Sequence, residues 1–139
     1  MALPPTSRTR RYTWPAVLIG LLVRCTSPSG PNPPSCSETD GETVTTTSSL
    51  TPTFAWSPNC LVDQVIVEEQ IAPSAGGPQM RWWIKSRTTG QGTAAPLRYG
   101  AVPASMDELL SAATLVTGHY YTVIVSSGTT EIGRVVLTP

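Results

Sequence analysis

Few side chains in the 139-residue sequence could do chemistry, and their spacing assembles no catalytic site. The chain has a single histidine, His119. One imidazole without a second histidine or a cysteine partner forms neither a zinc site nor a Ser-His-Asp triad. We therefore expect His119 to be structural or to face solvent.

The two acidic pairs also lack the geometry of catalytic carboxylates. Glu68 and Glu69 are neighbours in a β-prone stretch, so their side chains should point to opposite faces of a sheet and cannot flank one glycosidic bond. Asp107 and Glu108 fall in a capping box that predicts a helix over residues 105–112. Acidic groups in the first turn of such a helix interact favourably with its dipole.

No other motif in the sequence indicates a reaction. The serines lie outside G-x-S-x-G and S-x-x-K contexts, and no glycine-rich loop joins a strand to a helix. We predict a protein that is not an enzyme and that needs no metal ion or cofactor.

The elements that must position these residues are short strands. Fourteen prolines and eleven glycines with one phenylalanine favour a single all-β domain with a leader or tail. The formal net charge is zero, but four of the nine basic residues lie in the first 24. The rest of the chain has nine acidic against five basic residues, so we expect no nucleic-acid partner.

The first 25 residues are typical of an export signal. Arg8, Arg10 and Arg11 precede the apolar run Trp14–Val23. This run of ten residues suits a signal peptide and is well short of the roughly 20 needed to cross a bilayer. Arg10-Arg11 also allows a twin-arginine signal, although paired arginines are ordinary in any leader.

The end of this leader resembles the lipobox of bacterial lipoproteins. Leu22-Val23-Arg24-Cys25 is followed by the Pro/Ser-rich stretch Thr26–Ser35. The resemblance implies lipidation of Cys25 and a place in the cell envelope, on the periplasmic or cell-surface side of a membrane. Arg24 departs from the family pattern, which has a small residue there. Cleavage a few residues later and an uncleaved leader are the alternatives.

Residues 26–42 are predicted to be an extended linker, because their Pro, Ser, Gly and acidic content cannot bury a core. From Thr43 onward, β-prone segments recur at the spacing of a sandwich. We expect strands within residues 43–50, 51–58, 61–71, 80–86 and 97–100, from 119 onward, and over 132–138.

Alternation within these segments predicts which side chains face the core. Phe54 and Trp56 share one face of the second segment. The third segment has an apolar face that also carries Asp63 and Glu69 near its ends. Its apolar members are Leu61, Val65 and Val67.

Residues 80–86 alternate cleanly, with Met80, Trp82 and Ile84 predicted to face the core. The opposite face should then expose a tryptophan between two cations, namely Arg81, Trp83 and Lys85. Such a tryptophan can bind sugar rings or a protein partner, but an arginine stem or a neighbouring loop can equally cover it.

The stretch after residue 114 carries the strongest fold motif. Leu115, Gly118 and Tyr121 are spaced three apart and lead into alternating valines, which resembles the tyrosine corner of fibronectin-type-III and immunoglobulin-like sandwiches. The pattern P-T-F-x-W-x-P ending at Pro58 is similar to a strand of fibronectin-like domains in bacterial envelope proteins. The resemblance covers residues 43–139 and implies an antiparallel sandwich of about seven strands with the Tyr121 hydroxyl bonded to the preceding loop.

Two cysteines remain once Cys25 is assigned to the lipid. In an exported protein, Cys36 and Cys60 favour a disulfide over a metal or redox site, because no C-x-x-C motif is present. Two free thiols are the alternative.

These features predict a non-catalytic, membrane-tethered envelope lipoprotein domain that binds or scaffolds an envelope partner. The alternative is a carbohydrate-binding accessory domain that uses Trp83.

Overall fold

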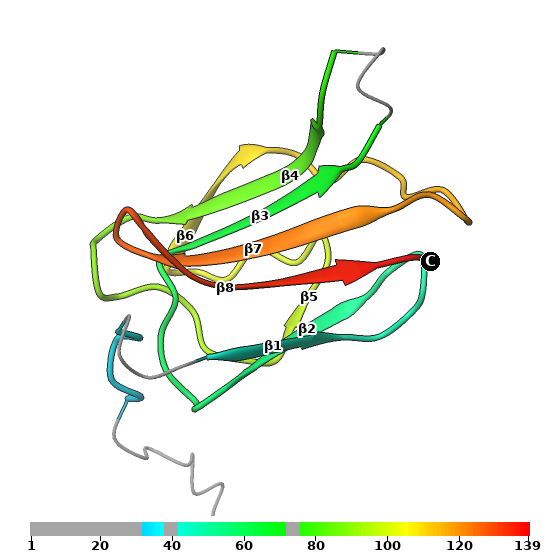
Figure 1. Ribbon diagram of the computed structural model, residues 1–139. Helices are drawn as coiled ribbons and strands as arrows, with labels where there is room; N and C mark the ends of the chain where they lie inside the picture. Colours follow the sequence, from blue (N-terminus) through cyan, green and yellow to red (C-terminus); the bar gives the residue numbers. More distant parts are fainter. Residues whose placement is uncertain (1–31, 38–41, 72–75) are drawn as a thin grey trace, which may run out of the picture. The chain divides into compact units, whose positions relative to one another are not determined.

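The computed structural model describes residues 32–37, 42–71 and 76–139, which form eight strands in two antiparallel sheets (Figure 1). The smaller sheet has the order β1-β2-β5, and the larger one has the order β6-β4-β3-β7-β8. The predicted all-β sandwich is therefore confirmed. The strand bounds are β1 Thr43–Thr46, β2 Thr53–Ser57, β3 Gln64–Glu69, β4 Gln79–Ser86, β5 Leu97–Arg98, β6 Met106–Leu110, β7 Tyr121–Ser127 and β8 Thr130–Leu137.

The core lies between the two sheets and is built largely from the side chains that alternation assigned to it. Phe54 of β2 and Trp82 of β4 are fully buried. Their rings lie 6.4 Å apart, and Tyr99 packs edge-on against Trp82 at 5.3 Å. Offset and edge-to-face aromatic pairs of this kind add to the apolar burial that holds the two layers together.

The tyrosine that opens β7 fixes the loop before it. Tyr121 is buried, and its hydroxyl accepts a hydrogen bond of 2.8 Å from the backbone N–H of Val116. Gly118 has φ of +82°, a conformation that side chains with a Cβ rarely adopt. Tyr120 is 60% exposed on the other face. The predicted hydroxyl-to-loop bond and strand faces are confirmed.

The helix predicted over residues 105–112 is wrong, because this segment contains strand β6. Met106 is buried in the core, and Asp107 lies opposite Lys85 of β4. The hydroxyl of Ser105 donates to the carbonyl of Gly92 and is not used as a helix cap. Pairing with β4 and burial of Met106 thus override the local capping preference.

A β-bulge changes the predicted faces at the start of β4. The register between β3 and β4 shifts at Val67/Glu68, so that Met80 lies opposite Glu68 and Arg81 is the extra residue. Met80 is 40% exposed, contrary to the prediction that it faces the core. Trp82 and Ile84, beyond the bulge, are buried as expected.

A disulfide joins Cys36 to Cys60, as predicted. Residues 34–36, which the sequence assigned to the linker, are hydrogen-bonded and disulfide-bonded to the sandwich, and we call them the docked segment. The N–H of Cys36 donates to Leu61 at 2.9 Å, and the N–H of Leu61 donates to Pro34 at 2.7 Å. Fixing the backbone of these three residues costs about 3–6 kcal/mol, whereas a few hydrogen bonds contribute about 0.5–1.5 kcal/mol each. The covalent bridge is therefore needed to hold this segment.

The predicted leader and Cys25 lie outside the described residues. Within the described ranges, no helix is long and apolar enough to cross a membrane.

Candidate functional site

The face of the larger sheet that points away from the smaller sheet carries a row of apolar side chains. The strand registers place Leu110 opposite Trp83, Trp83 opposite Ile66, and Ile66 opposite Ile124. Directly paired residues point to the same face, so these side chains form one continuous band across β6, β4, β3 and β7. We call these four residues the outer row.

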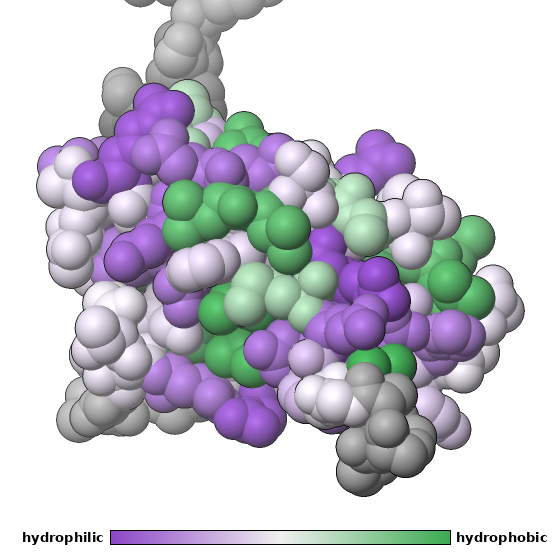
Figure 2. Space-filling view, turned by 90° about the horizontal axis from the view of Figure 1, so that it is seen from above, coloured by the Kyte–Doolittle hydropathy of each residue, from purple (hydrophilic) through white to green (hydrophobic). Residues whose placement is uncertain are grey.

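Hydrophilic side chains border the outer row. Seen from above the view of Figure 1, apolar residues gather near the middle of the molecule with hydrophilic residues around them (Figure 2). Lys85 lies opposite Asp107 and Gln64 on one side of the row. Arg134, opposite Ile124, forms an ion pair of 2.6 Å with Glu131 at the far end. An apolar centre with a polar rim is the usual anatomy of a protein interface.

Trp83 lies within the outer row and is only partly exposed. Its indole Nε1 is buried and has no hydrogen-bond partner among the described residues. An unpaired buried N–H is unfavourable and rare in folded proteins. Trp83 is therefore the one member of the row that combines apolar area with an unused donor.

Of the two cations predicted to flank Trp83, only Lys85 is exposed and without a charged partner among the described residues. The bulge directs Arg81 to the buried carboxylate of Glu69, and Arg81 Nε donates to Glu69 Oε2 at 2.6 Å. Lys85 lies beside Trp83 on the outer face. The prediction that Arg81 and Lys85 both flank Trp83 on the outer face is therefore wrong at Arg81.

Glu69 forms a cluster with Arg81 and His119 at the end of β3. The Glu69 side chain is only 4% exposed, and its second oxygen contacts Nδ1 of His119, whose side chain is 49% exposed. The hydrogen bond with His119 lowers the pKa of Glu69 most, and Arg81 lowers it further, against the opposing effect of burial. The cluster contains an imidazole and a carboxylate but no nucleophile, so it can stabilise the fold without performing a triad reaction.

A second buried carboxylate, Asp63, lies just before β3. Its two oxygens accept hydrogen bonds from the backbone N–H groups of Gly90 at 2.8 Å and Gly128 at 2.9 Å. Asp63 therefore joins the loop after β4 to the β7–β8 turn. The sequence indicated that Asp63 shares the apolar face of its strand, but not which groups it binds.

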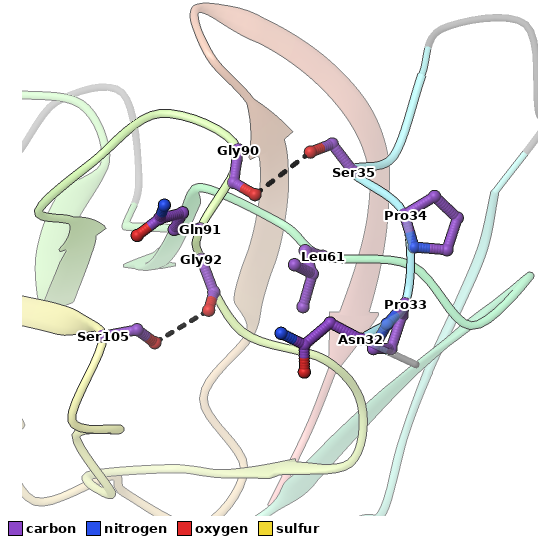
Figure 3. A pocket seen from close by; sticks show the side chains of 9 residues that line it. All are labelled: Asn32, Pro33, Pro34, Ser35, Leu61, Gly90, Gln91, Gly92 and Ser105. Atoms are coloured by element: carbon purple, nitrogen blue, oxygen red, sulfur yellow. Dashed lines mark hydrogen bonds between the residues drawn. The ribbon is translucent and has the colours of Figure 1, made fainter. Parts of the chain in front are cut away.

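A cavity of about 690 Å³ lies between the docked segment and the loop at Gly90 (Figure 3). Ser35 donates to the carbonyl of Gly90, and Ser105 donates to that of Gly92. Gly92 is required there, because a Cβ would lie 1.8 Å from the carbonyl oxygen of Val62. In the part of the chain that the structure describes, no charged side chain lines this cavity. Its lining residues are Asn32, Pro33, Pro34, Ser35, Leu61, Gly90, Gln91, Gly92 and Ser105.

Cys36, Cys60 and Glu42 bring three potential metal ligands within 4.8 Å of one another. The two sulfurs are bonded to each other, so neither is a thiolate that could bind a metal ion. One oxygen of Glu42 is buried there without a hydrogen-bond partner among the described residues. These three residues form a structural disulfide site, not a metal centre.

A comparison of the chain with protein-family models, with curated proteins and with solved structures finds no match.

Proposed function

We propose that this protein is an exported, non-catalytic envelope lipoprotein whose fibronectin-type-III-like sandwich binds or scaffolds a protein partner. Its lipid is attached at Cys25, and residues after Cys25 tether the sandwich to the outside of a bacterial membrane. The leader-like residues 1–25 and the lipobox-like end support the anchor. The binding surface is the outer row centred on Trp83.

One observation carries the binding proposal. The outer row crosses four strands without a polar residue, on a face that the second sheet does not cover. Its member Leu110 is 40% exposed, and Ile66, Trp83 and Ile124 are partly exposed. Contiguous exposed apolar area rimmed by polar residues favours a protein interface over an ordinary solvated face.

A carbohydrate-binding role for Trp83 is less well supported. Sugar rings stack on an open aromatic face, whereas Trp83 is partly covered within its row and Arg81 is occupied by Glu69. A binding assay with a panel of neutral oligosaccharides distinguishes the two functions. A carbohydrate-binding domain would bind them through Trp83, whereas a protein-binding domain would not.

The decisive experiment is crosslinking in the native cell from Lys85, which lies beside Trp83 and is the only lysine in the sequence. The crosslinked partner is identified by mass spectrometry. We expect Leu110→Arg, which puts a charge into an exposed part of the row, to reduce the crosslinked product about tenfold or more.

The matched control is Tyr120→Ala, which removes a side chain that is 60% exposed but lies outside the row. It should leave the crosslinked product unchanged. Equal yields from the wild type and Leu110→Arg would show that the outer row is not the binding surface.

A further inference from the structure

We infer that the Cys36–Cys60 disulfide sets the length of the tether and limits how far one end of the sandwich can lie from the surface that carries the anchor. This inference rests on the proposed anchor at Cys25. The end in question is the one that carries the cavity between the docked segment and the loop at Gly90.

The number of residues between Cys25 and the docked segment determines the greatest distance that the tether can span. From Cys25 to Ser35 there are ten residues, which span at most about 35 Å. If the chain were free up to β1, the distance from Cys25 to Thr43 would be eighteen residues, or about 60 Å. The docked segment therefore removes nearly half of the available reach.

The contacts of the docked segment depend on the bridge. Ser35 forms only an isolated bridge with Leu61, outside the named strands. Its hydroxyl bond to Gly90 is exposed and 3.2 Å long. Cys36 is the member of the segment that is buried, and it is buried as half of the disulfide. Without the bridge, the segment would lose its one core contact and the remaining bonds would open to water.

The end of the sandwich that carries the docked segment is rich in polar groups. Among the described residues, the cavity there is lined by amide, hydroxyl and backbone groups, together with two prolines and Leu61, and by no charged side chain. Arg87, which lies close by, is paired with Asp107 at 2.7 Å. The partly buried carboxylate of Glu42 lies beside the bridge at the same end. Together these polar groups suit the hydrated headgroup region of a membrane.

The first test measures docking and does not depend on the anchor. The full-length protein in detergent is compared with its Cys36→Ser/Cys60→Ser double variant by amide hydrogen exchange. We expect the Leu61 amide to be protected in the wild type and to exchange about tenfold faster or more in the double variant. The Val62 amide, which bonds to Thr93 at 2.9 Å, is the internal control and should stay protected in both. Equal protection of Leu61 in the two proteins would overturn the inference.

The second test measures reach. A donor fluorophore is attached to Lys85, and an acceptor fluorophore is attached to lipid headgroups. Lys85 lies opposite Gln64, which is three residues after Leu61 in the chain. We expect energy transfer in membranes to fall by about half or more in the double variant, because residues 36–42 are then added to the tether. Inserting eight Gly/Ser residues between Ser29 and Gly30 of the disulfide-bonded protein should lower the transfer similarly.

The outcomes separate the inference from the proposed anchor. If the protein stays in membranes but transfer is the same with and without the bridge, the tether inference is wrong and the anchor stands. If the protein does not partition into detergent at all, the proposed anchor is wrong. The inference that the disulfide limits the distance from a membrane is then wrong as well.

Discussion

Asp63 and Glu69 lie at opposite ends of β3, and both carboxylates are buried beside the core, yet they bind different kinds of donor. Asp63 receives two backbone N–H groups, from Gly90 and Gly128. Glu69 receives two side chains, those of Arg81 and His119. A buried carboxylate must have such donors, because an unpaired buried charge is strongly unfavourable.

The difference lies in what the donors can do if the carboxylate is lost. The N–H groups of Gly90 and Gly128 are fixed in their loops, so they cannot easily turn to another acceptor. Arg81 and His119 are 32% and 49% exposed and can turn to solvent. Asp63 should therefore matter more for stability at constant pH, and Glu69 more for its dependence on pH.

The largest effect is expected from Asp63→Ala. It leaves two backbone donors unpaired and should lower the free energy of unfolding by about 2–5 kcal/mol. Urea unfolding measures this change. Hydrogen exchange should show that the Gly90 and Gly128 amides lose protection together. A loss of less than about 1 kcal/mol would mean that water replaces the carboxylate easily.

Glu69→Gln should have a smaller effect, about 1–2 kcal/mol. The substitution keeps the shape and one acceptor oxygen, while Arg81 and His119 gain access to water. Measured under the same urea conditions as Asp63→Ala, it tests the comparison directly. If Glu69→Gln lowered the free energy of unfolding more than Asp63→Ala, the exposure of the donors would not determine how much a buried carboxylate contributes to stability.

The sequence allowed the positions of these carboxylates to be predicted better than their partners. Alternation placed Asp63 and Glu69 on the apolar face because a strand has a period of two, and the same rule found Phe54, Trp56 and Trp82. The donors come from distant loops and from a residue moved by a bulge. Gly90 and Gly128 are 27 and 65 residues from Asp63. Local patterns carry no information on contacts of this kind.

The same limit explains the two errors in the secondary structure. Residues 105–112 have a favourable helix start, but Met106 gains more by burial in the core on β6. At Arg81 the bulge inserts one residue, which breaks the strict alternation expected of β4. For the candidate site, the exposure of Lys85 followed from the sequence, while the outer row required the registers of four strands.

The pH dependence of stability should separate the wild type from Glu69→Gln. The pKa of Glu69 is lowered in the folded protein from its ordinary value of 4.5. Its stabilising contribution is therefore complete above about pH 4.5 and is lost as the pH falls through the lowered folded pKa. We expect the wild type to lose more stability than Glu69→Gln over this acid range, as measured by unfolding at a series of pH values. Parallel curves would show that the carboxylate charge of Glu69 has no net effect on folding.

The smallest effect is expected at His119. Its side chain is about half exposed, so its bond to Glu69 competes with water, and Arg81 still neutralises the carboxylate when the imidazole is gone. His119→Ala should cost less than about 1 kcal/mol. His119→Asn, which can place an amide N–H near the position of Nδ1, should cost less still. Thermal unfolding near neutral pH resolves the order of the two variants. A loss with His119→Ala as large as with Glu69→Gln would mean that the hydrogen bond from His119, which lowers the pKa of Glu69 most, also contributes more to stability than Arg81 does, despite the exposure of the imidazole.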